Sequence, residues 1–124
     1  MLPNDRKYTK THEWVIITGP VARVGLTDHA QHSLGALVFI ELPGIGDPVV
    51  AGQSLGDVES VKAVSDVVSP VTGTVRAVNK ALADAPERIN DDPWNAWLVE
   101  IDSIAGTEEL LDAAEYEAFC QNEE

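Results

Sequence analysis

The stretch Asp57–Pro70, DVESVKAVSDVVSP, decides the fold expected for this chain. Lys62 stands midway between two segments rich in valine, a β-branched residue that favours extended backbone. Two short strands joined at Lys62 predict a hairpin that holds the ammonium group in solvent at its tip. A lone lysine is most often an ordinary solvated turn residue, so any functional interpretation depends on the surrounding sequence.

Glycines flank this stretch at similar distances. Gly52 precedes Lys62 by ten residues (62 − 52), and Gly73 follows it by eleven (73 − 62). Each glycine opens a similar strand-like segment, and glycine suits a tight turn because it lacks a Cβ atom. The spacing therefore predicts two like strands on either side of the lysine, each beginning at a glycine turn.

Short strands with turn signals between them continue along the rest of the chain. A helix is expected over residues 27–35, because Thr27 is a good N-cap, Asp28 complements the helix dipole and Gly35 is a natural stop. Residues 80–90 predict a helical turn broken by Pro86, and residues 1–10 a loosely held lead-in. Further strands are expected over residues 12–18, 21–26, 36–43, 49–55, 73–79 and 94–101.

The C-terminal segment predicts a closing helix that begins at Thr107 as N-cap. Its apolar stripe is expected to pack against the sheets, and it consists of Leu110, Leu111, Ala114, Ala118 and Phe119. The fold class that follows is mainly β, with two antiparallel sheets packed face to face, short helices and a C-terminal helix.

Composition limits the partners. The chain has 124 residues, a usual size for one domain, and a net charge of −13 from 8 basic and 21 acidic residues. Nucleic acid and anionic membrane both attract Lys/Arg patches, so neither is expected as a partner. No apolar run approaches the length of a membrane span, and residues 1–10 lack the apolar middle of a signal peptide.

Histidine and cysteine are scarce. His29 and His32 lie three residues apart and could share a helix face, but only three histidines exist and no thiolate or carboxylate completes a ligand set. No metal is therefore expected. Cys120 is the single cysteine, which excludes an internal disulfide and leaves its role open.

Several blocks of the sequence resemble the H protein of the glycine cleavage system. ESVKAVSD at Glu59–Asp66 resembles its lipoylation site, and similar blocks follow one another in order over nearly the whole chain. These further blocks are THEW from Thr11, VGLTDHAQHSLGALVFIELPGIGDPV from Val24, SPVTGTVRAVN from Ser69 and LLDAAEYEAF from Leu110. The resemblance implies a barrel-sandwich hybrid and a single lipoyl-carrier domain over residues 1–124. Asn95 and Ala96 stand where many H proteins have glycines.

The resemblance also implies a function. Lys62 would carry lipoic acid in amide linkage, which supplies the disulfide chemistry that a single cysteine cannot provide. The protein would be a monomeric, non-catalytic carrier. It would take the aminomethyl group of glycine from a pyridoxal-phosphate glycine decarboxylase to a tetrahydrofolate-dependent aminomethyltransferase, and dihydrolipoamide dehydrogenase would reoxidise it.

Two groups of site residues follow from the family motifs. A cleft for the aminomethyl arm would use Glu13 and Asp66 for the ammonium group, with Thr11 and Ser69 as lesser hydrogen-bonding groups. Lipoate-attaching enzymes would recognise the residues around Lys62, which are Glu59, Ser60, Val61 and Ala63. The expected location is the bacterial cytoplasm, or the mitochondrial matrix if a transit segment has been removed.

Other interpretations stay open on the residues alone. The chain could be the lipoyl domain of a 2-oxoacid dehydrogenase or a biotin carrier, although biotin sites usually flank the lysine with methionines and Lys62 has Val61 and Ala63. It could be an interaction or lipoate-relay module without glycine cleavage activity. An enzyme with Lys62 as Schiff-base nucleophile is disfavoured, because Glu59 and Asp66 would raise the pKa of the lysine.

Overall fold

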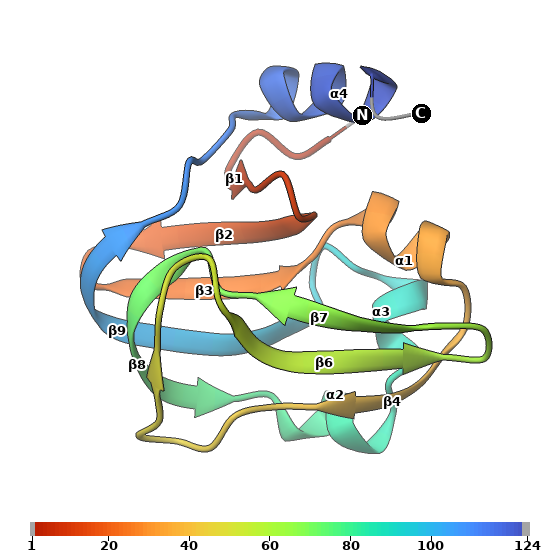
Figure 1. Ribbon diagram of the computed structural model, residues 1–124, viewed down its shortest axis with the longest axis horizontal. Helices are drawn as coiled ribbons and strands as arrows, with labels where there is room; N and C mark the ends of the chain where they lie inside the picture. The colour runs from red at the N-terminus through yellow and green to blue at the C-terminus, as the bar shows by residue number, and fades with distance from the viewer. Residues whose placement is uncertain (1, 123–124) are drawn as a thin grey trace.

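The computed structural model describes residues 2–122. Two antiparallel sheets pack face to face, as the sequence predicted, and they do not form a closed barrel. The larger sheet has the strand order β1-β2-β3-β9-β8-β5 and the smaller has the order β4-β6-β7 (Figure 1). The strands are β1 Lys7–Tyr8, β2 Glu13–Thr18, β3 Val21–Leu26, β4 Leu37–Glu41, β5 Pro48–Val49, β6 Ser54–Ser60, β7 Val64–Val68, β8 Val71–Val78 and β9 Trp97–Thr107.

Branched aliphatic side chains from both sheets fill the space between them. Strands β2 to β9 each contribute apolar side chains to this core, whereas Tyr8 of β1 belongs to a separate cluster with Trp14, Leu111 and Tyr116. Val15, Val24, Val58, Val75 and Ile101 are each at most 1 % exposed. Burial of this apolar surface holds the two sheets together and fixes the register of the strands.

Helix α1, Asp28–Leu34, forms where the sequence predicted it. The Thr27 side chain accepts a hydrogen bond from the Ala30 N–H group, and the Gly35 N–H group donates to the Gln31 carbonyl. Gly35 has φ +87°, a conformation that only glycine adopts without strain. Two short helices, α2 Lys80–Asp84 and α3 Arg88–Asp91, lie on either side of Pro86 as expected.

The predicted start of the C-terminal helix was wrong. Thr107 is the last residue of β9 and pairs with Val71, whereas helix α4 runs Ala113–Asn122. The Asp112 side chain accepts from the Glu115 N–H group and the Glu115 side chain accepts from the Asp112 N–H group, which is a capping box. This reciprocal pair, and not Thr107, begins the helix.

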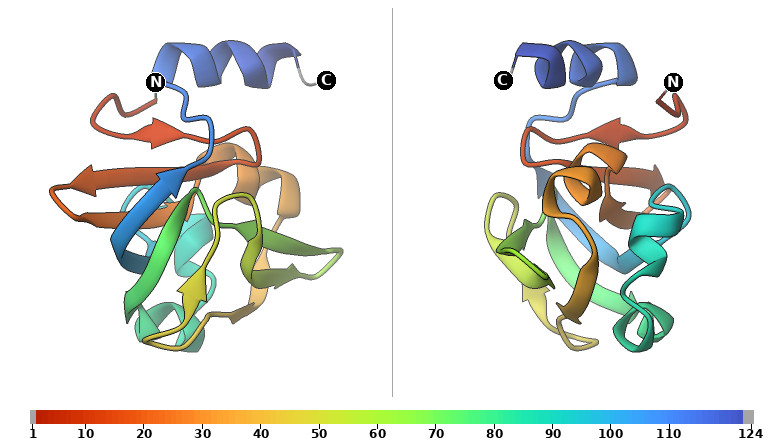
Figure 2. Two further views of the ribbon diagram at one scale, coloured as in Figure 1. Left: turned by 60° about the vertical axis from the view of Figure 1, so that its left-hand side comes forward. Right: turned by 90° about the vertical axis from the view of Figure 1, so that its right-hand side faces the viewer.

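The buried face of α4 also differs from the prediction. Ala114 and Ala118 are exposed, and Leu110 and Leu111 precede the helix. Tyr116 is fully buried instead and stacks on Tyr8 at 4.8 Å between ring centroids. Figures 1 and 2 show α4 lying along the edge of the larger sheet beside β1. The pair of Tyr8 and Tyr116 joins α4 to β1.

Two smaller predictions were also wrong. Residues 1–10 are not a loose lead-in throughout, because β1 pairs with β2 and Tyr8 is 0 % exposed. Gly73 does not sit at a tight turn but within β8, where an added Cβ atom would collide with the Asp102 carbonyl oxygen. Gly52, with φ +87°, does lie at a turn. The predicted glycine turn is therefore found before Lys62 but not after it.

Candidate functional site

The hairpin of β6 and β7 displays Lys62 at its tip, as the sequence predicted. Glu59 pairs with Val64 at the end of the ladder, and Val61–Ala63 form the connection. The connection has no glycine, so a side chain stabilises it: the Ser60 hydroxyl accepts from the Lys62 and Ala63 N–H groups at 3.3 and 3.1 Å. Ser60 itself is 4 % exposed, whereas Lys62 is exposed.

The hairpin tip is held against the connection between α1 and β4. The Val61 N–H group donates to the Ala36 carbonyl at 3.3 Å. A methyl group added at Gly35 would lie 3.6 Å from the Lys62 Cε atom, so the lysine stem passes over the end of α1. The tip therefore has a defined position while its ammonium group remains in solvent.

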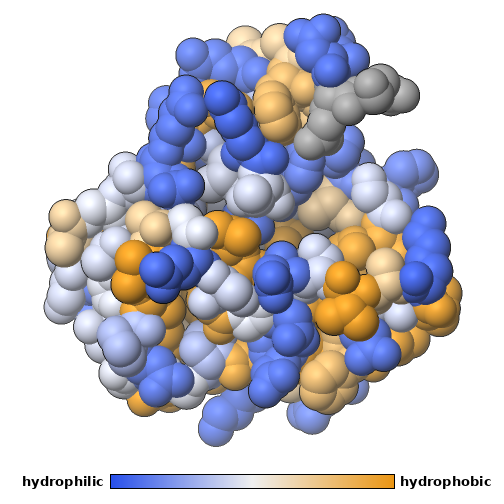
Figure 3. All heavy atoms as spheres, viewed as in Figure 1, coloured by the Kyte–Doolittle hydropathy of each residue, from blue (hydrophilic) through white to orange (hydrophobic). Residues whose placement is uncertain are grey.

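The residues around Lys62 form a mixed surface. Glu59 and Ala63 are exposed, and Val61 and Val64 keep 75 % and 67 % of their surface in solvent. Figure 3 has the same view as Figure 1, and it shows hydrophobic residues among hydrophilic ones on the right, where the hairpin of β6 and β7 ends. Exposed apolar side chains beside a protruding lysine give another protein a recognisable surface.

Glu13 is a buried carboxylate at the start of β2, with 1 % of its surface exposed. Its Oε1 atom accepts from the hydroxyls of Thr9 and Thr11 at 2.6 and 2.5 Å, and its Oε2 atom accepts from the Val68 N–H group at 3.2 Å. Burial raises the pKa of Glu13 to about 6, and the hydrogen bonds from Thr11, Thr9 and Val68 oppose that rise.

The structure brings Thr11 and Glu13 together but places Asp66 and Ser69 differently. The Asp66 side chain is exposed on β7, and its carboxylate accepts from the Ser54 hydroxyl at 3.5 Å. The Ser69 hydroxyl is fully buried and donates to the Val71 carbonyl at 2.6 Å. Glu13 contacts the last residue of β7, Asp66 lies within that strand and Ser69 follows it, and the four residues do not form one hydrogen-bonded cluster.

A shallow cleft of about 280 Å³ connects the region of the hairpin with that of Glu13. One wall is the face of α1 that carries Ala30, Ser33 and Leu34, and Ser65 of β7 forms the opposite wall. Thr11, which donates to Glu13, also lines it. The cleft begins beside the end of α1 over which Lys62 passes, so it provides a groove along which a flexible arm on Lys62 could lie.

Sequence reasoning missed Thr9 as a partner of Glu13. Thr9 is 3 % exposed and reaches Glu13 because residues 9–12 form a tight turn, in which the His12 N–H group donates to the Thr9 carbonyl. His12 adopts φ +74° at this turn. Nothing in the local sequence distinguishes this turn from a continuous strand.

A lysine exposed at the tip of a hairpin, on a scaffold of two packed sheets, is the arrangement expected of a carrier domain that bears a group on one side chain. Residues 6–123 match the family model of the glycine cleavage H-protein. The chain therefore belongs to the glycine cleavage H-protein family, whose members are non-catalytic lipoyl carriers of the glycine cleavage system.

Individual relatives agree with this assignment. The glycine cleavage system H protein of Lachnoclostridium phytofermentans is 56% identical over 94% of this chain and 92% of its own length. That of Acidobacterium capsulatum is 52% identical over 98% of this chain and 95% of its own length. The crystal structure of a glycine cleavage system H protein from Mycobacterium marinum superposes with a TM-score of 0.92 at 42% identity, covering 97% of this chain and 99% of that one.

The relatives also exclude two of the alternatives that the sequence left open. Full-length similarity to H proteins excludes a biotin carrier or a 2-oxoacid dehydrogenase lipoyl domain as the family of this chain.

Among residues 2–122, no helix is both long enough and apolar enough to cross a membrane.

Proposed function

We propose that Lys62 is the lipoyl attachment site and that this chain carries the aminomethyl group of glycine between the enzymes of the glycine cleavage system. Its partners are a pyridoxal-phosphate glycine decarboxylase, a tetrahydrofolate-dependent aminomethyltransferase, dihydrolipoamide dehydrogenase and the enzymes that attach lipoate. The chain acts as a single-domain monomer in the bacterial cytoplasm.

The observation that carries the proposal is the position of Lys62. Its side chain is exposed at a hairpin tip whose backbone is held by Ser60 and by the Ala36 carbonyl. Lipoate bound there supplies a cyclic disulfide on a long neutral arm, which is chemistry that the single cysteine of this chain cannot supply. A hairpin tip of defined position that carries a long flexible arm suits the transfer of a group between separate enzymes.

Within this proposal the cleft beside α1 receives the arm when it carries its cargo. Thr11 lines the cleft and donates to Glu13, so an ammonium group at that end would meet the Thr11 hydroxyl, with the buried Glu13 carboxylate directly behind it. A cation beside Glu13 would favour its ionised form and lower its raised pKa. Asp66, exposed on β7, would provide a second carboxylate, and Ser69 would hold the turn that follows β7.

Recognition by the lipoate-attaching enzymes would use the surface around the lysine. Glu59, Val61 and Ala63 are exposed and can be contacted directly. Ser60 would act by keeping the connection in shape, since its hydroxyl accepts from two backbone N–H groups of that connection. The proposal predicts that Ser60→Ala slows lipoylation by distorting the tip, and Glu59→Lys by altering its charge.

Reconstitution with the partner enzymes tests the function. Lipoylated wild-type chain should support glycine-dependent formation of methylene-tetrahydrofolate, and Lys62→Ala should abolish it while the circular dichroism spectrum and unfolding midpoint stay unchanged. Lys80→Ala is the matched control and should retain full turnover, because Lys80 is an exposed lysine on α2. Turnover by Lys62→Ala would remove Lys62 from the mechanism.

A further inference from the structure

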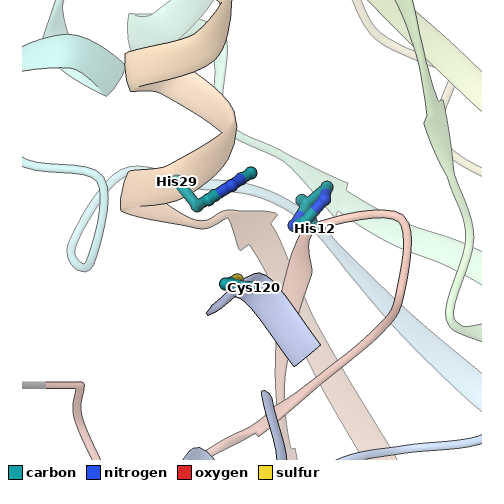
Figure 4. A group of neighbouring side chains, drawn as sticks. All are labelled: His12, His29 and Cys120. Carbon is teal, nitrogen blue, oxygen red and sulfur yellow. The ribbon is translucent and has the colours of Figure 1, made fainter. Parts of the chain in front are cut away.

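Three metal-ligating side chains from distant parts of the chain meet beside helix α1. His12 lies in the turn before β2, His29 on α1 and Cys120 on α4, and their ligand atoms all lie within 4.8 Å of one another. Figure 4 shows the two imidazole rings and the cysteine gathered where these three elements meet. All three side chains are partly buried.

We propose that His12, His29 and Cys120 bind a zinc-class transition metal ion. Two imidazoles and one thiolate are the donor types that Zn²⁺ prefers, whereas Mg²⁺ and Ca²⁺ require oxygen ligands. Three protein ligands leave one coordination position for water or another ligand.

The surroundings of the cluster suit a metal. The His12 Nδ1 atom shares a hydrogen bond of 2.6 Å with the Tyr116 hydroxyl, which in turn lies 2.7 Å from the Thr27 hydroxyl. Metal-bound histidines commonly have their second nitrogen held by such a partner, which fixes the ring. We therefore assign the Nε2 atom of His12 to the metal and Tyr116 to its positioning.

Charge provides an independent argument. His29 and Cys120 line an open cleft of about 640 Å³. Four carboxylates, those of Asp28, Asp91, Asp92 and Glu117, also line it, and no lysine or arginine is among the described residues of its wall. This cleft therefore attracts a cation to the side of the cluster that faces solvent.

Binding requires a small local rearrangement. The rings of His12 and His29 are stacked, with centroids 4.2 Å apart and planes at 20°, so their nitrogen lone pairs lie in nearly parallel planes and do not converge on one point. Ligand atoms around a tetrahedral zinc ion lie about 3.5 Å apart, given bond lengths near 2.0 to 2.3 Å. Rotation of the His29 ring and a closer approach of the Cys120 sulfur can reach that geometry without moving the strands.

The metal would tie α4 to the body of the protein. It would join the turn before β2, the first turn of α1 and the last turns of α4. A metal ion that binds only the folded state raises the free energy of unfolding. Metal binding also releases protons, because imidazole and thiol ligands must be deprotonated. His12 and His29 also line the cleft beside α1 that is proposed to receive the arm. The test of the metal site therefore uses a chain that cannot carry lipoate, so that its outcome is separate from that of the proposed function.

Cobalt titration tests the site directly. The full-length chain is used as Lys62→Arg, fully reduced, so that lipoyl thiols cannot bind the probe. One equivalent of Co²⁺ should produce a thiolate-to-cobalt charge-transfer band in the near ultraviolet together with the intense visible bands of four-coordinate cobalt. Zn²⁺ should displace both sets of bands.

Variants assign the ligands. Cys120→Ser and His29→Asn should each abolish the charge-transfer band, and His32→Asn, an exposed histidine on the same helix, should leave it unchanged. Tyr116→Phe should weaken cobalt affinity by roughly 10- to 100-fold. Zinc should also slow alkylation of Cys120 by iodoacetamide in the parent chain. Absence of the band in the parent chain, or its persistence in Cys120→Ser or His29→Asn, would overturn the proposal.

Discussion

Replacing Glu13 by glutamine tests the burial of its carboxylate. The pKa of Glu13 rises from 4.5 to about 6 in the folded chain, mainly because burial removes the carboxylate from water. The folded state therefore binds this proton more tightly than the unfolded state does. The resulting stabilisation is fully present below pH 4.5 and is lost as the pH rises through about 6.

The size of the effect follows from the change in pKa. A rise of about 1.5 corresponds to about 2 kcal/mol in the free energy of unfolding, of which roughly 1 kcal/mol is lost between pH 5 and pH 7. Glutamine does not titrate there. Its amide would place a donor near the Val68 N–H group at a cost of about 1 to 3 kcal/mol, which is the same at each pH.

Urea unfolding of the unlipoylated chain at pH 5, 6 and 7 measures the effect. The free energy of unfolding of the wild type minus that of Glu13→Gln should fall by roughly 1 kcal/mol from pH 5 to pH 7. Glu117→Gln, at an exposed position on α4, is the control for the removal of one carboxylate charge elsewhere on the chain. A difference for Glu13→Gln that is constant, or that grows with pH, would refute the burial argument.

Four further substitutions test the scaffold by urea unfolding. Gly35→Ala should lower the free energy of unfolding by about 1 to 3 kcal/mol, because φ +87° strains any residue with a Cβ atom; an unchanged midpoint would contradict this. Tyr116→Phe should cost about 1 to 3 kcal/mol by leaving His12 and Thr27 without the hydroxyl that both contact, and a stabilised variant would count against that network. Asp112→Ala should cost about 1 kcal/mol through loss of the capping box, whereas Thr107→Ala should have little effect if α4 begins where described.

The hairpin and α1 could be predicted because local signals specify them. Valines on both sides of Lys62 favour extended backbone, and Thr27 with Gly35 marks both ends of α1. The stabilisation of the hairpin tip by Ser60 could not be predicted from the sequence. Serine is common near turns, and only the structure shows its hydroxyl accepting from two N–H groups.

The start of α4 shows a prediction that went wrong although a signal existed. Thr107 and Asp112 are both acceptable N-caps, but only Asp112 is followed three residues later by a glutamate that completes a capping box. Thr107 instead continues β9, because its backbone pairs with Val71. Pairing between distant strands outweighed the local preference.

Contacts between the ends of the chain could not be predicted at all. Tyr8 lies in a polar segment, and nothing nearby indicates that it stacks on Tyr116. The same packing brings Cys120 to His12 and His29, so a search for ligands close together in sequence found only His29 and His32. Such clusters depend on how α4 docks, which is a property of the whole fold.

Peptide mapping of the full-length protein, purified from its lipoate-replete native host, tests the central claim most directly. Intact mass should show a single lipoyl increment, and the peptide that contains Lys62 should carry it. The peptides with Lys7, Lys10 and Lys80 should be unmodified. A full-length chain from such cells with an unmodified Lys62 would contradict the assignment of this residue as the carrier site.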